Sequence, residues 1–219
     1  MARPIAADHD DKRRAILKAA AAMFARNGFD RTSVNEIAAS CGVSKALLYH
    51  YYTNKEQLLF DIIRAHLDDL VAATAAVPSG LTPSETLRAM IAALLEAYRH
   101  ADEEHQIQIS DMKRLPEDKK AELIERERVL VRRFAGAIAA LEPALAGHRA
   151  ALTPLTMNLF GMMNWKFMWF RENGPVSHEA FADLVMTMIE AGAREVARRL
   201  APDPAPAGGG GPRIRVVQG

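Results

Sequence analysis

The chain has one cysteine, few aromatic residues and no excess of charge of either sign. Because Cys41 is the single cysteine among 219 residues, a disulfide framework within the chain is excluded, and a reducing, cytoplasmic environment is expected. The 28 basic and 27 acidic side chains nearly cancel, so nucleic-acid binding has to be inferred from a local patch. Residues 1–60 hold nine basic and six acidic side chains, a net charge of +3, which places that patch near the N-terminus.

The sequence also lacks a long uninterrupted hydrophobic run. The most apolar stretch, 152–170, is barely long enough to span a bilayer and contains Lys166, Asn158 and Asn164. A helix buried on all sides of a helical bundle is therefore favoured, and we expect no membrane association. Charged residues from Asp8 to Arg14 follow the first few residues, so no signal peptide is predicted.

The motifs of common enzyme classes are missing. The chain contains no nucleophile elbow, no phosphate-binding loop and no HExxH pair. His100 and His105 flank two acidic residues, but positions five apart on one helix point about 140° apart and share a metal poorly. We expect no catalytic residue, no metal and no cofactor. An enzyme remains the alternative of a different class, and it would place ionisable residues together in a hollow of the body.

Apolar residues recur at spacings of three and four, without convincing strand-like alternation, which predicts an all-α fold of about nine helices. Proline and glycine breaks separate them. The expected helices cover about 12–27, 33–41, 44–51, 54–71, 83–98, 105–113, 117–141, 152–170 and 177–200. Residues 1–60 are interpreted as a three-helix head and 61–200 as a larger helical body. Residues 201–219, rich in proline and glycine, are predicted to be a disordered tail.

The segment Val34–Tyr51 has the pattern of a helix-turn-helix unit. Two short helices joined at a glycine share one small core, which constrains their small and apolar positions. Ala38 lies where the helices cross closely, and Gly42 lies where the turn favours a positive φ. Apolar groups fill the remaining core positions, which are Ile37, Cys41, Val43, Leu48 and Tyr51. An ordinary helical hairpin is the alternative interpretation.

The other side chains of the second short helix face outward and are suited to the major groove of DNA. Lys45 can reach a guanine edge or a phosphate, while Tyr49 and His50 can hold phosphate. Ala46 or Leu47 can touch a thymine methyl group. Lys55 conflicts with the dipole of the helix that it begins, unless a phosphate lies there; a solvated surface lysine is the alternative.

Within residues 10–63, four short stretches resemble the TetR family of bacterial transcription regulators: Phe24–Val34, Ile37-Ala38, Gly42-Val43-Ser44 and Leu48–Glu56. The resemblance implies a homodimer that reads a palindromic operator in double-stranded DNA, with the last two helices paired across the dimer. It also implies a small-molecule effector that binds among the middle helices and releases the DNA. Residues 1–60 would then be the DNA-binding domain, and residues 61–200 the ligand-binding and dimerisation domain. The implied DNA contacts are Thr32, Ser44, Lys45, Leu47, Tyr49, His50 and Lys55.

The body is faintly similar to regulators of phenylacetate and other acyl-CoA degradation, through His105-Gln106 and Leu115-Pro116. Methionine and aromatic residues crowd 157–170, where core or dimer contact is the alternative to a pocket. We expect a largely apolar cavity for a hydrophobic or aromatic effector, including acyl or aryl thioesters of coenzyme A. The expected ligand contacts are Tyr98, His105, Phe134, Met162, Trp165 and Trp169, and the expected dimer contacts are Leu184 and Met188.

The sequence thus predicts a DNA-binding transcription regulator, most simply a ligand-released repressor. An activator is one alternative. Another is a dimeric regulator without an effector, controlled by a protein partner or by its own abundance; a solidly packed body would favour it.

Overall fold

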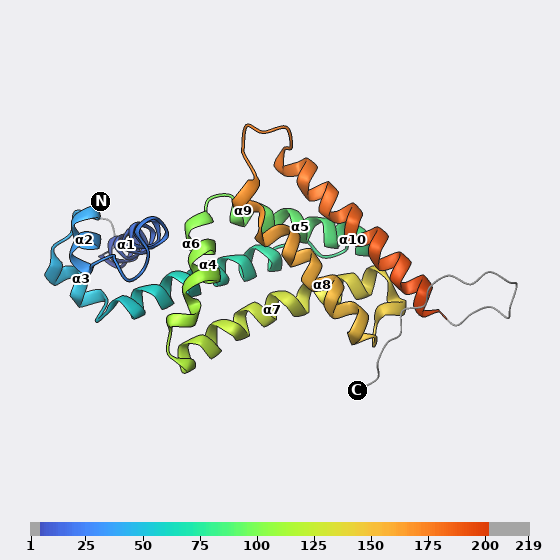
Figure 1. Cartoon of the computed structure of the whole chain (residues 1–219), viewed down its shortest axis with the longest axis horizontal. Helices are drawn as coiled ribbons and strands as arrows, with labels where there is room; N and C mark the ends of the chain where they lie inside the picture. Colours follow the sequence, from blue (N-terminus) through green and yellow to red (C-terminus); the bar gives the residue numbers. More distant parts are fainter. Residues whose placement is uncertain (1–4, 202–219) are drawn as a thin grey trace, which may run out of the picture. The chain divides into compact units, whose positions relative to one another are not determined.

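The computed structural model describes residues 5–201, with side chains from residue 12 onward. Within this range the regular elements are all helical, which confirms the predicted fold class (Figure 1). The head helices are α1 (Ile5–Asn27), α2 (Val34–Ser40), α3 (Lys45–Tyr51) and the start of α4 (Lys55–Ala75). They are followed by α5 (Pro83–Tyr98), α6 (Asp102–Asp111), α7 (Glu117–Leu141), α8 (Arg149–Asn164), α9 (Lys166–Trp169) and α10 (His178–Leu200). Two 3-10 turns, η1 (Met112–Arg114) and η2 (Pro143–Leu145), join α6 to α7 and α7 to α8.

The apolar segment predicted as one helix over 152–170 is divided in the structure. α8 ends at Asn164, and the backbone of Trp165 (φ −89°, ψ 1°) leaves the regular helix before the single turn of α9. Large apolar residues such as Met163 and Phe167 lie on both sides of this break, so the spacing of apolar residues gave no sign of it. α6 begins at Asp102, three residues before the expected start, with three acidic residues in its first turn that favour a helix N-terminus.

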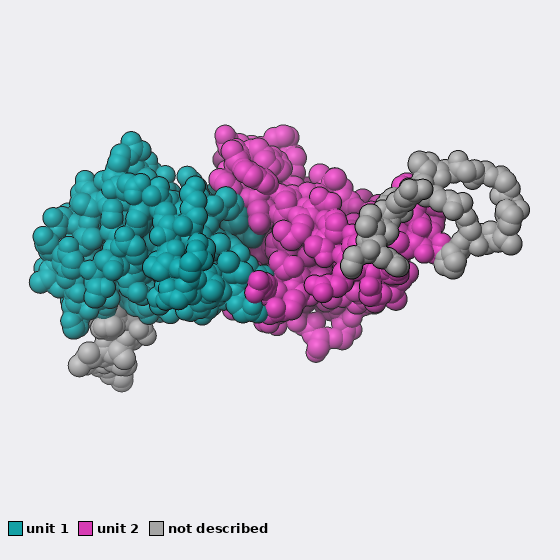
Figure 2. Space-filling model, turned by 60° about the horizontal axis from the view of Figure 1, so that its bottom comes forward, with its two compact units in different colours: residues 1–71, 98–127 teal, residues 72–97, 128–219 magenta. Residues whose placement is uncertain are grey.

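The described chain forms two compact units (Figure 2). Unit 1 comprises residues 1–71 and 98–127, so it joins α1–α3 and most of α4 to α6, η1 and the first part of α7. Within it, α6 packs against α1. Its fully buried side chains include Ile16, Phe24, Ile37, Leu48, Leu58, Leu59, Ile63, Ile107 and Leu123. The proposed functional division at residue 60 remains a prediction.

Unit 2 comprises residues 72–97 and 128–219, and its core lies between α5, the second part of α7, α8 and α10. α8 packs against α10. The buried core includes Leu87, Ile91, Phe134, Ile138, Leu159, Val185 and Ile189. The tail predicted for 201–219 lies outside the described residues, except for Ala201. None of the described helices is long and apolar enough to cross a membrane.

Candidate nucleic-acid interface

Side-chain caps fix the start of both short helices of the helix-turn-helix unit. The Ser33 hydroxyl accepts a hydrogen bond from Glu36 N (3.2 Å), and the Glu36 carboxylate accepts one from Ser33 N (2.7 Å). Ser44 caps α3 by accepting from Leu47 N at 3.1 Å. Gly42 has a φ of +65°, as the turn was predicted to require. The predicted DNA contact Ser44 thus has a local structural role.

The core beneath α3 contains the predicted residues Ile37, Ala38 and Leu48, all buried. Cys41, Val43 and Tyr51 were expected to face inward as well, but they are only partly buried. Tyr52, which sequence reasoning missed, is buried instead. α3 ends at Tyr51, so the backbone of Tyr52 is extended (φ −138°, ψ 117°) and its ring points inward. The spacing of residues on a continuous helix would not have placed this ring in the core.

The buried Tyr52 takes part in a polar connection between α1 and α4. Arg13 Nε donates to the Tyr52 hydroxyl (3.3 Å), and Arg13 Nη2 lies 2.6 Å from Asp61 Oδ2. Burial raises the pKa of Tyr52, so its phenol stays protonated at neutral pH. Through Arg13, these contacts hold the residues between α3 and α4 and the first turns of α4 against α1.

Most of the side chains predicted to face outward from α3 are exposed. Lys45, Tyr49 and His50 are exposed, and Lys45 Nζ lies 5.8 Å from the centroid of the Tyr49 ring. Leu47 is half-buried. A short helix with a cation, a phenol and an imidazole on one accessible side has the chemistry to contact base edges and phosphates.

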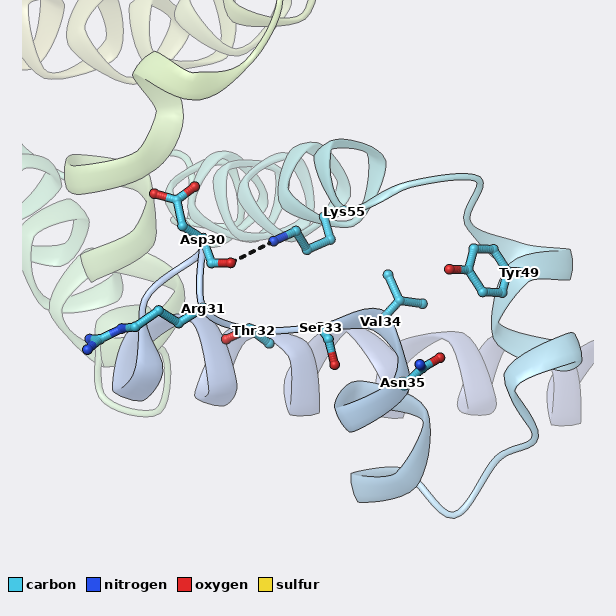
Figure 3. A pocket seen from close by; sticks show the side chains of 8 residues that line it. All are labelled: Asp30, Arg31, Thr32, Ser33, Val34, Asn35, Tyr49 and Lys55. Carbon is cyan, nitrogen blue, oxygen red and sulfur yellow. Dashed lines mark hydrogen bonds between the residues drawn. The ribbon is translucent and has the colours of Figure 1, made fainter.

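A hollow of about 320 Å³ opens beside this surface (Figure 3). The loop before α2, Tyr49 of α3 and Lys55 of α4 surround it. It is lined by Asp30, Arg31, Thr32, Ser33, Val34, Asn35, Tyr49 and Lys55. Of the predicted DNA contacts, the structure therefore brings together Thr32, Tyr49 and Lys55. Arg31, Ser33 and Asn35 also line the hollow, but they were not among the predicted DNA contacts. The S-x-x-E pattern from Ser33 to Glu36 indicates the start of a helix here, and it was the one sequence signal that pointed to this place.

Thr32 lines the hollow, but its side chain is buried. Its hydroxyl lies 3.0 Å from Gly28 O and 3.3 Å from Met23 O, where it closes the turn after α1. A hydroxyl donates one hydrogen, and here that hydrogen is directed at backbone carbonyls. The hydroxyl of Thr32 is therefore not directed at a DNA phosphate, and the predicted contact would involve its backbone.

Lys55 is held by carbonyl groups. Its Nζ donates to Phe29 O (2.9 Å) and Asp30 O (3.2 Å), and it lies 4.7 Å from the centroid of the Phe29 ring. The two carbonyl oxygens therefore stabilise the positive charge of Lys55, which we had expected a bound phosphate to balance. Asn54 caps α4, because its side-chain oxygen accepts a hydrogen bond from Gln57 N at 2.8 Å.

Two of the predicted ligand contacts, Tyr98 and His105, meet in unit 1 together with His66 of α4. The rings of Tyr98 and His105 have centroids 4.5 Å apart, and His105 Nδ1 lies 3.4 Å from His66 Nε2. All three side chains are buried. Burial, with a smaller contribution from His105, lowers the pKa of His66 to about 3. His66 was missed because it occupies one position in a long apolar face of α4.

The other predicted ligand contacts belong to unit 2. Phe134 is fully buried and packs edge-on against Phe160, with ring centroids 5.2 Å apart, and Met162 is half-buried. Trp165 and Trp169 are 53% and 50% exposed. The two indole rings therefore do not line an enclosed cavity within this chain, in contrast to the prediction. Their contact with an effector remains a prediction.

The two predicted dimer contacts are exposed apolar residues on α10. Leu184 and Met188 are 52% and 54% exposed, and Met157 of α8 is exposed too. These positions leave large apolar side chains on the outer faces of two helices that pack together. Among the side chains that the structure describes, no group of three or more His, Cys, Asp or Glu could hold a metal ion.

Residues 16–62 match the family described as bacterial regulatory proteins, tetR family, and residues 80–193 match the tetracyclin repressor-like C-terminal domain. The HTH-type transcriptional repressor KstR2 of Mycobacterium tuberculosis (strain CDC 1551 / Oshkosh) is 35% identical over 97 residues. That alignment covers 44% of this chain and 48% of KstR2, so it spans about half the length of this curated relative.

Solved structures are similar over more of the chain. A TetR-family transcriptional regulator from Bordetella parapertussis 12822 has a TM-score of 0.75 and 34% identity, covering 81% of this chain and 93% of that protein. AibR, crystallised with isovaleryl coenzyme A and operator DNA, has a TM-score of 0.68 and 29% identity, covering 81% and 97%. Both likenesses extend well beyond the helix-turn-helix head.

Proposed function

Since this chain belongs to the TetR family of bacterial regulatory proteins, we propose that it is a dimeric repressor released from a palindromic operator by a small molecule. DNA binding by α3 is supported by the exposed Lys45, Tyr49 and His50 beside a hollow that Lys55 and Arg31 also line. This combination is the observation that carries the proposal. α3 would enter the major groove, and the hollow would receive a backbone phosphate of the same half-site.

Selection of bound sequences from random duplex DNA by the full chain tests this proposal. We expect an enriched palindrome whose half-sites lie about one helical turn, or a multiple of it, apart, because two symmetric heads bind one face of the duplex. Affinity should fall steeply with salt, since lysine contacts with phosphate release counterions. Failure to enrich any sequence, with folding verified by circular dichroism, would contradict the proposal.

The proposed dimer would pair α8 and α10 with the same helices of a second copy. Leu184 and Met188 on α10, with Met157 on α8, support this arrangement because large apolar side chains left in water favour association. A two-fold axis through this interface would also relate the two heads to the two halves of a palindrome.

For the effector we propose a hydrophobic acyl or aryl thioester of coenzyme A. The similarity to AibR, which was crystallised with isovaleryl coenzyme A and operator DNA, supports this class of compound. Tyr98 and His105, whose buried rings meet within unit 1, would supply polar anchors. An effector can release DNA only if it binds the DNA-incompetent state more tightly than the DNA-bound one.

Titration of the operator complex with isovaleryl coenzyme A, followed by fluorescence anisotropy of labelled DNA, tests the effector. We expect the DNA to be released as the thioester is added, with coenzyme A alone as the control. Tryptophan emission should change in parallel if Trp165 or Trp169, both half exposed, contacts the compound. If a panel of acyl and aryl thioesters and free acids leaves the complex intact, the regulator without an effector replaces this proposal.

The proposed place of action is the cytoplasm, where operator DNA and acyl thioesters are both present. A single, partly buried cysteine whose pKa is raised by burial is compatible with a reducing compartment and with a structural, unreactive thiol. We propose a regulator without catalytic activity.

A further inference from the structure

The contacts of Arg114 connect the 3-10 turn η1 with the loop between α1 and α2. Its Nη1 lies 2.8 Å from Asp30 Oδ2, and its Nε lies 2.6 Å from Asp111 Oδ1. The guanidinium carbon also lies 5.6 Å from the centroid of the Phe29 ring. A single side chain therefore joins the end of α6 to two consecutive residues of the loop that leads into the hollow.

Lys55 contacts the same two loop residues, and it donates hydrogen bonds to both of their backbone carbonyl groups. Figure 3 shows the Lys55 ammonium directed at the Asp30 carbonyl oxygen, while the Asp30 carboxylate points away from it. The carboxylate is thus left to Arg114, with which it forms an ion pair. The Asp30 side chain is 72% exposed and Asp30 lines the hollow, so it places a negative charge at the rim of the proposed phosphate site.

We propose that Arg114 is a positioning residue for DNA binding, which neutralises Asp30 at the rim of the hollow and holds the Phe29–Asp30 segment in place. The inference rests on the proposed function, because it matters only if a phosphate enters the hollow. An unpaired carboxylate at the rim would repel that phosphate. Arg114 also donates a hydrogen bond to the largely buried Asp111 at the end of α6. A displacement of α6 would therefore move Arg114 and change how well it neutralises the Asp30 carboxylate.

Substitution of Arg114 by glutamine tests the proposal. Arg114→Gln should weaken operator binding about two- to fivefold per head, the range expected for losing one exposed ion pair. In an Asp30→Asn background the same substitution should have a much smaller effect, because no carboxylate remains to be neutralised. Arg126→Gln is the matched control. It removes an ion pair with Asp68 (2.7 Å) within unit 1, about 20 Å along α4 from Lys55.

Hydrogen exchange of the free protein supplies a readout that does not depend on DNA. Arg114→Gln should speed amide exchange in residues 28–35 several-fold and leave α10 unchanged, whereas Arg126→Gln should change neither. Unchanged exchange in the loop, or losses of affinity that add up in the double variant, would overturn the proposal. If the wild-type chain selects no DNA, the proposed function fails, and the exchange experiment alone then decides whether Arg114 positions the loop.

Discussion

Single side chains around α3 divide into those that build the head and those left to contact a partner. Leu48 and Tyr52 are buried, while Lys45, Tyr49 and His50 remain exposed on the same short stretch. This separation matters for mutagenesis because exposed side chains can be truncated without opening a cavity. DNA binding and folding should therefore respond to different substitutions in α3.

Lys45→Ala and Tyr49→Ala should each weaken operator binding by about 1–3 kcal/mol, the usual cost of losing a base contact. Neither should change the free energy of unfolding by more than about 0.5 kcal/mol, since both side chains are exposed. Gel shift and urea denaturation measure the two quantities. Arg149→Ala, which removes an exposed positive charge from α8, serves as the control. Unchanged affinity in both α3 variants would refute the role of this helix.

His66 should make the folded protein sensitive to acid. Its folded pKa of about 3 lies below the ordinary value of 6.5, so the unfolded chain takes up the proton first as the pH falls. Its contribution to stability is thus complete above about pH 6.5 and decreases toward pH 3, by at most about 1.4 kcal/mol per pH unit.

Urea denaturation between pH 7 and 4.5 checks this dependence. His66→Gln should give a flatter profile than the wild type, because glutamine does not titrate. The exposed His100→Gln should retain the steep profile. Parallel profiles for the wild type and His66→Gln would show that His66 is not held neutral by burial.

The stability of α2 and α3 depends on N-cap residues that can be recognised in the sequence. Ser33 has two roles, because its hydroxyl caps α2 and Ser33 also lines the hollow. Ser33→Ala should lower the free energy of unfolding by about 0.5–2 kcal/mol. Ser33→Asp should retain the cap and the stability, but it should weaken operator binding by placing a negative charge beside the proposed phosphate.

Thermal denaturation combined with fluorescence anisotropy separates the two effects of these variants. Ser177→Ala, which removes the corresponding cap from α10, controls for loss of a cap outside the head. If Ser33→Asp binds the operator as tightly as the wild type, the hollow does not receive a phosphate.

The sequence predicted helices best where strong local signals bound them. The bounds of α7, Glu117–Leu141, were predicted to the residue because Pro116 and Pro143 flank it. Tyr52, His66 and the contact between Arg114 and Asp30 were missed, since they depend on how distant segments pack. The exposure of Trp165 and Trp169 was also unpredictable, because an apolar segment does not reveal which of its sides packs inside the chain.

Assembly of the dimer should be sensitive to charge on the outer face of α10. Leu184→Asp or Met188→Asp should produce monomers that no longer bind the operator, because an obligate interface of about 2,000 Å² or more does not tolerate an unpaired charge at its centre. Sedimentation velocity measures the change. Ala140→Asp, at an exposed position of α7, introduces the same charge elsewhere as a control. A wild-type chain that sediments as a monomer at micromolar concentration would contradict the dimer.

The preference of the full chain for its selected operator over a shuffled duplex is the most direct test of sequence-specific repression by a dimer. At a salt concentration near 0.15 M we expect two chains per operator duplex and a preference of at least about 1,000-fold, the lower range for specific DNA-binding proteins. Fluorescence anisotropy measures the preference, and sedimentation of the complex measures the stoichiometry. Equal affinity for the two duplexes, or one chain per operator, would contradict a dimeric, sequence-specific regulator.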